Sequence, residues 1–249
     1  MTMTRAPRAT SGGRRAAGCL PGLLLVLAVT ACSAADRATS PEEVRELASG
    51  TQAQEARKTA EDYRRNTVRA YDRDTPLTLG LVTVTDTCIG GAAREWFFPT
   101  DDDRYRIHCD LRITAYYGAD PKRIGDVLDG ILTAGDHDVS ASSPGPIPFE
   151  HGGPLVDYYR GKGPNPTGPG TPEPARLSTP GQTLSWDTLR SSRATPVAES
   201  GPCPPDDPPV TRCLREPASA TVAGLRKQYG MVFALELSAS DYYTVLRDS

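Results

Sequence analysis

Apolar and polar residues alternate along residues 104–117. The odd-numbered positions form the apolar set, which is Tyr105, Ile107, Cys109, Leu111, Ile113, Ala115 and Tyr117. The even-numbered positions are mostly charged or polar. A period of two is that of a β-strand, so the pattern predicts a long strand with one buried face and one hydrated face.

A helical period appears in two other places. In residues 121–134 an apolar stripe recurs every three to four positions, Asp120-Pro121 form a helix start, and Gly135 ends it. Earlier in the chain, Ser40-Pro41 begin a helical pattern that continues to about Tyr71 with a break at Gly50. The half before the break is polar on most faces and predicts a stalk, whereas the second half predicts a helix laid on the domain.

The rest of the pattern completes an α+β domain. Strands are expected at residues 79–88 and 184–189, and a closing hairpin at 219–225 and 231–237, with Met231, Phe233, Leu235 and Leu237 facing inward. Residues 144–181 contain ten prolines and eight glycines in 38 positions, which predicts a long irregular loop without regular elements. The expected fold is a mostly antiparallel sheet with two helices packed on one face. It would form a single domain over residues 73–249, after an anchor, tether and N-terminal helix at 32–72.

The first 31 residues have the composition of an export signal. Arg5, Arg8, Arg14 and Arg15 are followed by an apolar run at residues 23–29, and no acidic residue interrupts them. A membrane-spanning helix needs roughly 20 apolar residues. The much shorter run here indicates a signal-peptide core instead.

The end of this signal, Val29-Thr30-Ala31-Cys32, resembles the lipobox of bacterial lipoproteins. The resemblance implies cleavage before Cys32, lipid on its thiol, and attachment to the outer face of the cytoplasmic membrane. A plain signal peptide with a chance cysteine and an uncleaved anchor are the alternatives. Cys19 precedes the apolar run, where no membrane-inserted segment would present it. The Arg14-Arg15 pair leaves open whether export follows the general secretory or the twin-arginine route.

Charge limits the partners of the mature chain. Removing the signal takes away four of the 28 basic residues and none of the 31 acidic ones, which leaves a net charge of −7. This balance argues against nucleic acid or anionic lipid as the main partner. Arginine outnumbers lysine 24 to 4, as is typical of GC-rich genomes, and the whole resembles small actinobacterial lipoproteins. The chain is short for a two-lobed solute-binding lipoprotein.

Four cysteines remain outside the signal and the lipid site: Cys88, Cys109, Cys203 and Cys213. An even number in an oxidising compartment predicts two disulfides. Of the three pairings, Cys88–Cys109 and Cys203–Cys213 are favoured because each closes a local loop. A zinc site is the competing interpretation, but the sequence has no Cys-x-x-Cys pair among them and no histidine at ligand spacing. We therefore expect no metal and no cofactor.

One group of side chains suggests a ligand. Arg104, Arg106, His108 and Arg112 share one face of the predicted strand, where they would contact an anion such as a phosphate or a wall polymer. The competing interpretation is a hydrated face whose charges deter edge pairing. Asp101-Asp102-Asp103 is expected to be a polar turn, because it lacks the spacing of an EF-hand calcium loop.

No common catalytic motif is present in the sequence. The leading hypothesis is therefore a non-enzymatic binding or scaffolding lipoprotein of the cell envelope, whose partner is an envelope protein or polymer. The alternative is a hydrolase of envelope components with a site around His108 or His137.

Overall fold

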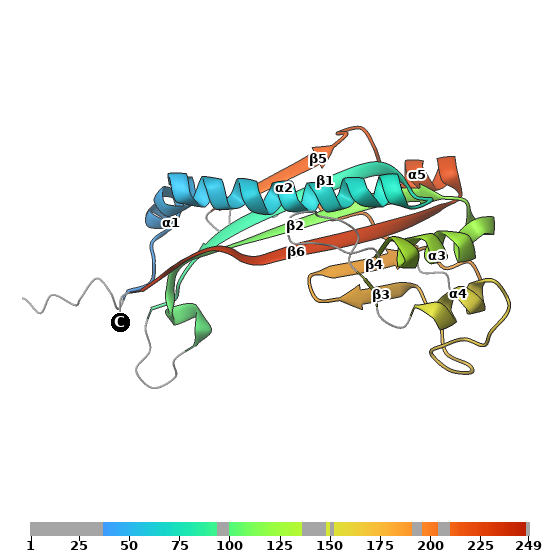
Figure 1. Ribbon diagram of the computed structural model, residues 1–249. Helices are drawn as coiled ribbons and strands as arrows, with labels where there is room; N and C mark the ends of the chain where they lie inside the picture. Colours follow the sequence, from blue (N-terminus) through green and yellow to red (C-terminus); the bar gives the residue numbers. More distant parts are fainter. Residues whose placement is uncertain are drawn as a thin grey trace, which may run out of the picture. The chain divides into compact units, whose positions relative to one another are not determined.

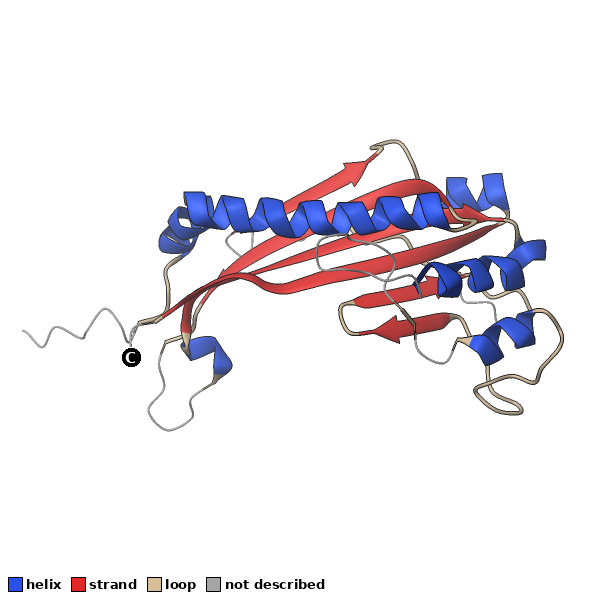
Figure 2. Cartoon of the chain, viewed as in Figure 1, coloured by secondary structure: helices blue, strands red, loops and turns tan. Residues whose placement is uncertain are grey.

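The computed structural model describes residues 37–93, 100–135, 148–149, 152–190, 196–203 and 210–247. The described residues form an α+β fold, as the sequence predicts (Figures 1 and 2). Its helices are α1 (Pro41–Ser49), α2 (Thr51–Asp74), α3 (Ile124–Gly135), α4 (Gly153–Tyr159) and α5 (Val222–Tyr229). Its strands are β1 (Thr78–Gly90), β2 (Tyr105–Ala119), β3 (Arg176–Thr179), β4 (Gln182–Trp186), β5 (Val210–Glu216) and β6 (Met231–Leu246).

The six strands form one sheet in the order β3-β4-β6-β2-β1-β5. Every neighbouring pair is antiparallel. The long helix α2 runs along one face of this sheet, and α3 covers the same face nearer to β4 (Figure 1). None of the described helices is both long and apolar enough to pass through a membrane.

The alternation in β2 divides the sheet into a buried and a hydrated face. All seven odd-numbered side chains from Tyr105 to Tyr117 are buried. Leu111, Ile113 and Tyr117 pack with Tyr71 of α2 and Leu128 of α3 in the main core. The inward residues predicted for β6, Met231, Phe233, Leu235 and Leu237, are also buried there. The predicted long strand and the predicted helix at 121–134 are thus confirmed.

The N-terminal helix begins and breaks where the sequence indicates. Ser40 Oγ accepts a hydrogen bond from Glu43 N at 3.2 Å, and extended backbone at Gly50 separates α1 from α2. The expectation of a stalk was wrong, because Val44 and Ala48 of α1 are buried against the Cys88–Cys109 pair. Val44 and Ala48 are four residues apart, so both project from the same face of α1, which packs on the sheet.

The predicted strand at 219–225 is instead the helix α5. Thr221 caps it by accepting a hydrogen bond from Gly224 N at 3.0 Å, and Gly230 ends it with a φ of 98°. Val222 and Leu225, three residues apart, are buried against Tyr116, so the spacing is that of a helix. No hairpin forms, because β6 pairs with β2 and β4.

The Pro/Gly-rich segment 144–181 contains two regular elements that were not expected. Helix α4 has Pro154 in its first turn, where the backbone N–H that proline lacks would have no partner within the helix, and it buries Leu155, Val156 and Tyr159. Strand β3 pairs with β4 at the sheet edge. Strand β5 likewise begins within the proline-rich stretch 203–213, and it pairs with β1. Short elements survive this composition where tertiary contacts bury one of their faces.

Both favoured disulfide pairings are confirmed. Cys88 and Cys109 face each other across β1 and β2, with a Cα–Cα distance of 4.1 Å, and Cys203 joins Cys213 of β5 at 5.8 Å. The first disulfide lies on the helix-covered face. Cys213 lies opposite Thr85, so the second disulfide lies toward the hydrated face.

A buried charge attaches α2 to the sheet. Asp86 of β1 is 1% exposed, accepts a hydrogen bond from the Tyr242 hydroxyl at 2.7 Å, and pairs with Arg57 of α2. Burial and the adjacent Asp86 carboxylate raise the pKa of Tyr242 well above its ordinary value. Arg212 of β5 pairs with Glu61 of the same helix. These contacts fix α2 over β1 and β5, on the side of the core away from α3.

We expect Leu128→Ala to lower the free energy of unfolding by about 2–5 kcal/mol, because Leu128 is fully buried between α3 and the sheet. Leu189, which is 40% exposed, is the matched control, and Leu189→Ala is expected to change stability by less than about 0.5 kcal/mol. Urea unfolding followed by circular dichroism measures both. Equal effects would contradict the assigned core.

Alkylation of the unreduced chain should leave Cys88, Cys109, Cys203 and Cys213 unmodified, because all four are in disulfides. Peptide mapping by mass spectrometry should recover Cys88 linked to Cys109 and Cys203 linked to Cys213. A peptide joining Cys88 to Cys203 or Cys213 would contradict the strand register.

Candidate functional site

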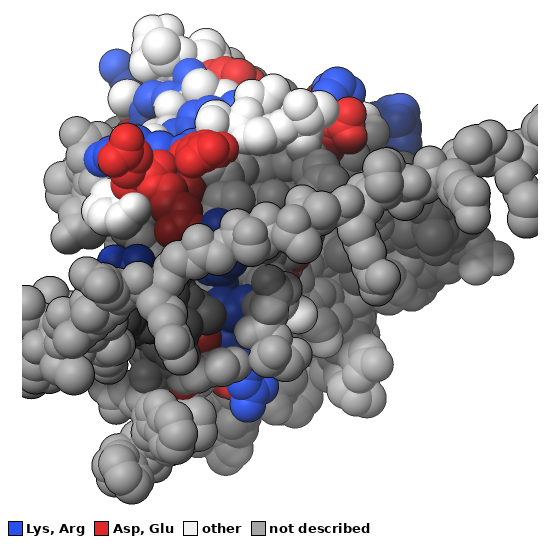
Figure 3. All heavy atoms as spheres, turned by 90° about the vertical axis from the view of Figure 1, so that its left-hand side faces the viewer, with Lys and Arg blue, Asp and Glu red and all other residues white. Residues whose placement is uncertain are grey.

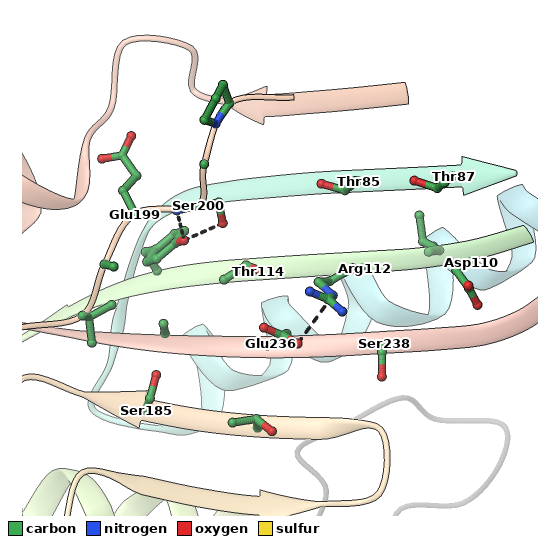
Figure 4. A pocket seen from close by; sticks show the side chains of 18 of the residues that line it. Thr85, Thr87, Asp110, Arg112, Thr114, Ser185, Glu199, Ser200, Glu236 and Ser238 are labelled. Carbon is green, nitrogen blue, oxygen red and sulfur yellow. Dashed lines mark hydrogen bonds and ion pairs between the residues drawn. The ribbon is translucent and has the colours of Figure 1, made fainter. Parts of the chain in front are cut away.

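The hydrated face of the sheet is hollowed into a polar trough (Figure 4). Its volume is about 730 Å³, within the range of small-molecule sites. The trough lies on the face opposite α2, and four neighbouring strands form its floor. The floor residues are Thr85 and Thr87 of β1, Asp110, Arg112 and Thr114 of β2, Glu236 and Ser238 of β6, and Thr183 and Ser185 of β4.

Strand register places the floor residues in rows across the sheet. Thr85, Arg112 and Ser238 lie directly opposite one another on β1, β2 and β6. The adjacent row joins Thr114 to Glu236 and continues to Thr183 on β4. Since directly opposed residues point to the same side, each row presents a continuous line of polar side chains.

Arg112 and Glu236 are the charged pair in the middle of the floor. Arg112 Nε lies 3.5 Å from Glu236 Oε1 (Figure 4). Their side chains are 63% and 45% exposed, so the pair adds little to stability.

One wall of the trough is a segment without regular structure, residues 196–203, which we call the strap. Val197, Ala198, Glu199, Ser200, Gly201 and Pro202 of the strap line the trough. The Tyr116 hydroxyl accepts a hydrogen bond from Ser200 N at 2.7 Å, which ties the strap to the floor. The Cys203–Cys213 disulfide then ties its end to β5.

Two carboxylates position the strap against α5. Asp187, which follows β4 and is buried, accepts hydrogen bonds from Val197 N at 2.7 Å and from Arg226 Nε at 2.8 Å. Glu199 accepts one from Val222 N, at the start of α5, at 2.8 Å, and pairs with Arg215. The hydrogen bond from Val222 N, together with the Arg215 guanidinium, lowers the pKa of Glu199 below its usual value despite partial burial.

Of the four residues predicted to contact an anion, only Arg112 lies in the trough. Arg104 precedes β2 and pairs with Asp101 at 3.2 Å, and Arg106 pairs with Glu43 of α1. Figure 3 shows this end of the unit, where charged side chains of both signs lie close together. An anionic ligand on this row would have to compete with carboxylates of the same chain.

His108 lies between two carboxylates. Its Nε2 is 2.9 Å from Asp110 Oδ2, and its Nδ1 is 2.6 Å from Asp241 Oδ1. Asp241 has a φ of 57° and lies in an irregularity of the β2–β6 pairing, where Asp110 also accepts a hydrogen bond from Asp241 N. The imidazole thus fastens a bulge next to the trough. His137 and His151 lie outside the described residues.

The aspartate cluster at 101–103 forms a short 3-10 helix before β2, which fits the expected polar turn. Asp103 is buried and accepts a hydrogen bond from Thr100 N at 3.1 Å. Within the described ranges, no three histidine, cysteine, aspartate or glutamate side chains are placed to hold a metal ion.

Sequence reasoning missed the trough as a site. Its signal was visible, because threonines occur at 83, 85 and 87 in one predicted strand and at 114 in another. What could not be seen was which strands are neighbours, and hence which polar positions share a floor.

Comparison with known proteins found no matching family model, no matching curated protein and no matching solved structure.

The lowered pKa of Glu199 predicts a pH-dependent stability. A carboxylate with a lowered folded-state pKa stabilises the fold above its unfolded pKa, and this contribution is lost as the pH falls through the folded value. Glu199→Gln should therefore be less stable than the native chain at neutral pH, and the difference should shrink in acid. Urea midpoints measured from pH 7 to about pH 3 test this. A difference that grows on acidification would contradict it.

Proposed function

We propose that this protein is a lipoprotein held by lipid on Cys32 at the outer face of the cytoplasmic membrane, where it binds an envelope component in the polar trough. The lipobox-like sequence before Cys32 supports the proposed membrane localisation. The trough is the observation that carries the binding role, because it is the hollow where side chains from four strands and the strap converge.

A short connection to the anchor fits this proposal. Four residues separate Cys32 from Arg37. The Arg37 carbonyl accepts a hydrogen bond from Arg247 at 2.7 Å, and Thr39 N donates to Gly91 O at 3.0 Å. The folded unit is therefore fastened from its first described residues. With two acyl chains on Cys32, this tether would keep the domain close to the bilayer surface.

The surroundings of His108 favour binding over hydrolysis. A histidine that activates a hydroxyl nucleophile needs one ring nitrogen within hydrogen-bond reach of it. Both nitrogens of His108 instead face carboxylates, which fasten the bulge at Asp241. In the trough itself the charged centre is the Arg112–Glu236 pair, a combination suited to hydrogen-bonding a ligand.

Cys32→Ser should release the protein from membranes or leave an uncleaved precursor, because serine offers no thiol for lipid attachment. Cys19→Ser is the matched control, since this cysteine precedes the apolar run, and its processing should match that of the native chain. Fractionation, intact mass and labelling with a fatty-acid analogue measure the outcome. Full membrane retention and normal processing of the Cys32 variant would refute the anchor.

A further inference from the structure

We propose that the trough binds an uncharged, hydroxyl-rich chain, namely a neutral glycan of the envelope. This deepens the binding role proposed above and rests on it.

Hydroxyl groups line the floor of the trough. In five floor residues the side-chain hydroxyl makes no hydrogen bond with any residue that the structure describes. These residues are Thr85, Thr87, Thr114, Ser185 and Ser238. Each is only partly exposed, and a hydroxyl both donates and accepts. A ligand rich in hydroxyls has the same dual character and would match the floor at any of these positions.

The charges of the trough disfavour an anionic ligand. Three carboxylates, Asp110, Glu199 and Glu236, line it against one guanidinium, Arg112. A phosphate or uronate chain would meet an excess of negative charge, as it would over the acidic mature chain as a whole.

A cationic ligand is also disfavoured, because each carboxylate already has a positively charged or N–H partner. Glu236 pairs with Arg112, and Glu199 with Arg215 and Val222 N. Asp110 contacts His108 and Asp241 N. A cation would have to displace these partners, whereas a neutral polyol can hydrogen-bond to lone pairs and N–H groups that remain.

The extent of the trough suits a chain rather than a single sugar. Its floor runs along β2 from Asp110 to Tyr116, and six residues of strand span about 20 Å. The binding surface is a sheet face, so the backbone N–H and C=O groups of the floor are already hydrogen-bonded between strands. An extended peptide would find no strand edge there to pair with. Side-chain hydroxyls are what the surface offers.

The test uses the full lipidated chain, purified from membranes in a zwitterionic detergent without sugar groups, and saturation-transfer NMR. The neutral probes are chitotetraose, maltotetraose and mannotetraose. The charged probes are the matched glucosamine tetramer, which is cationic, and tetragalacturonate, which is anionic. We expect transfer to at least one neutral tetramer with a dissociation constant on the order of 1 mM, and weaker transfer to both charged ones.

The variant Thr85→Val/Thr114→Val/Ser238→Ala removes three hydroxyls and adds no bulk to the side chains. It should weaken binding by about tenfold or more. Thr244→Val, on β6 outside the trough, is the matched control and should bind as the native chain does. Circular dichroism and urea midpoints confirm that each variant is folded. If the triple variant unfolds, Thr85→Val alone should still reduce transfer.

Three results would overturn the proposal: no transfer to any neutral tetramer up to about 10 mM, stronger transfer to a charged tetramer, or unchanged binding by the folded triple variant. These outcomes are separate from those of the anchor experiment. Membrane retention of the Cys32→Ser variant would refute the lipid anchor at Cys32 but would not bear on glycan binding in the trough. If the Cys32→Ser variant is released from membranes but no neutral tetramer binds, the anchor stands and the glycan proposal fails.

Discussion

The strict alternation of β2 is the constraint on which the rest of this structure depends. Successive side chains of a strand point to opposite faces, so a strand that commits every second residue to a core fixes the other face as well. Here Leu111, Ile113, Ala115 and Tyr117 pack in the core beneath α2 and α3. Arg112 and Thr114 are thereby directed to the opposite face, where they form part of the trough floor. The same twofold period thus produces both the core and the candidate site.

The two faces are stabilised by different interactions. Below α2 and α3, burial of apolar side chains such as Tyr71, Leu128 and Phe233 supplies most of the driving force. On the other face, an apolar cluster of the described residues lies at the end near α5. Over the trough, hydrogen bonds to Asp187 and Glu199 and the Cys203–Cys213 disulfide hold the strap in place. The strap also packs through Val197 on the apolar cluster near α5, and it forms a wall of the trough beside the polar floor.

Periodicity predicted those elements whose pattern extends over several turns or several strand residues, namely β1, β2, α2, α3 and the first half of β6. Among the short elements, α1 and part of β4 were predicted, whereas α4, β3 and β5 were missed and α5 was taken for a strand. In α5 the pair Val222 and Leu225 fits a helix, but eight residues with few apolar positions do not distinguish the two periods, and burial against Tyr116 decides. The disulfides were predictable because nearby cysteines close short loops. The trough was not, since it depends on strand order, which places β4 beside β6 across a long stretch of sequence.

Strand order also changes the meaning of the arginine row that the sequence brought forward. Taken along β2 alone, Arg106, His108 and Arg112 appear as a stripe of positive charge. Across the sheet and its helices, each has an acidic neighbour: Glu43 from α1, Asp241 from β6, and Glu236 from β6. Opposite charges on adjacent elements thus offset the positive charge of the stripe. What remains distinctive is its array of hydroxyl groups, and this array is the reason to expect a neutral ligand.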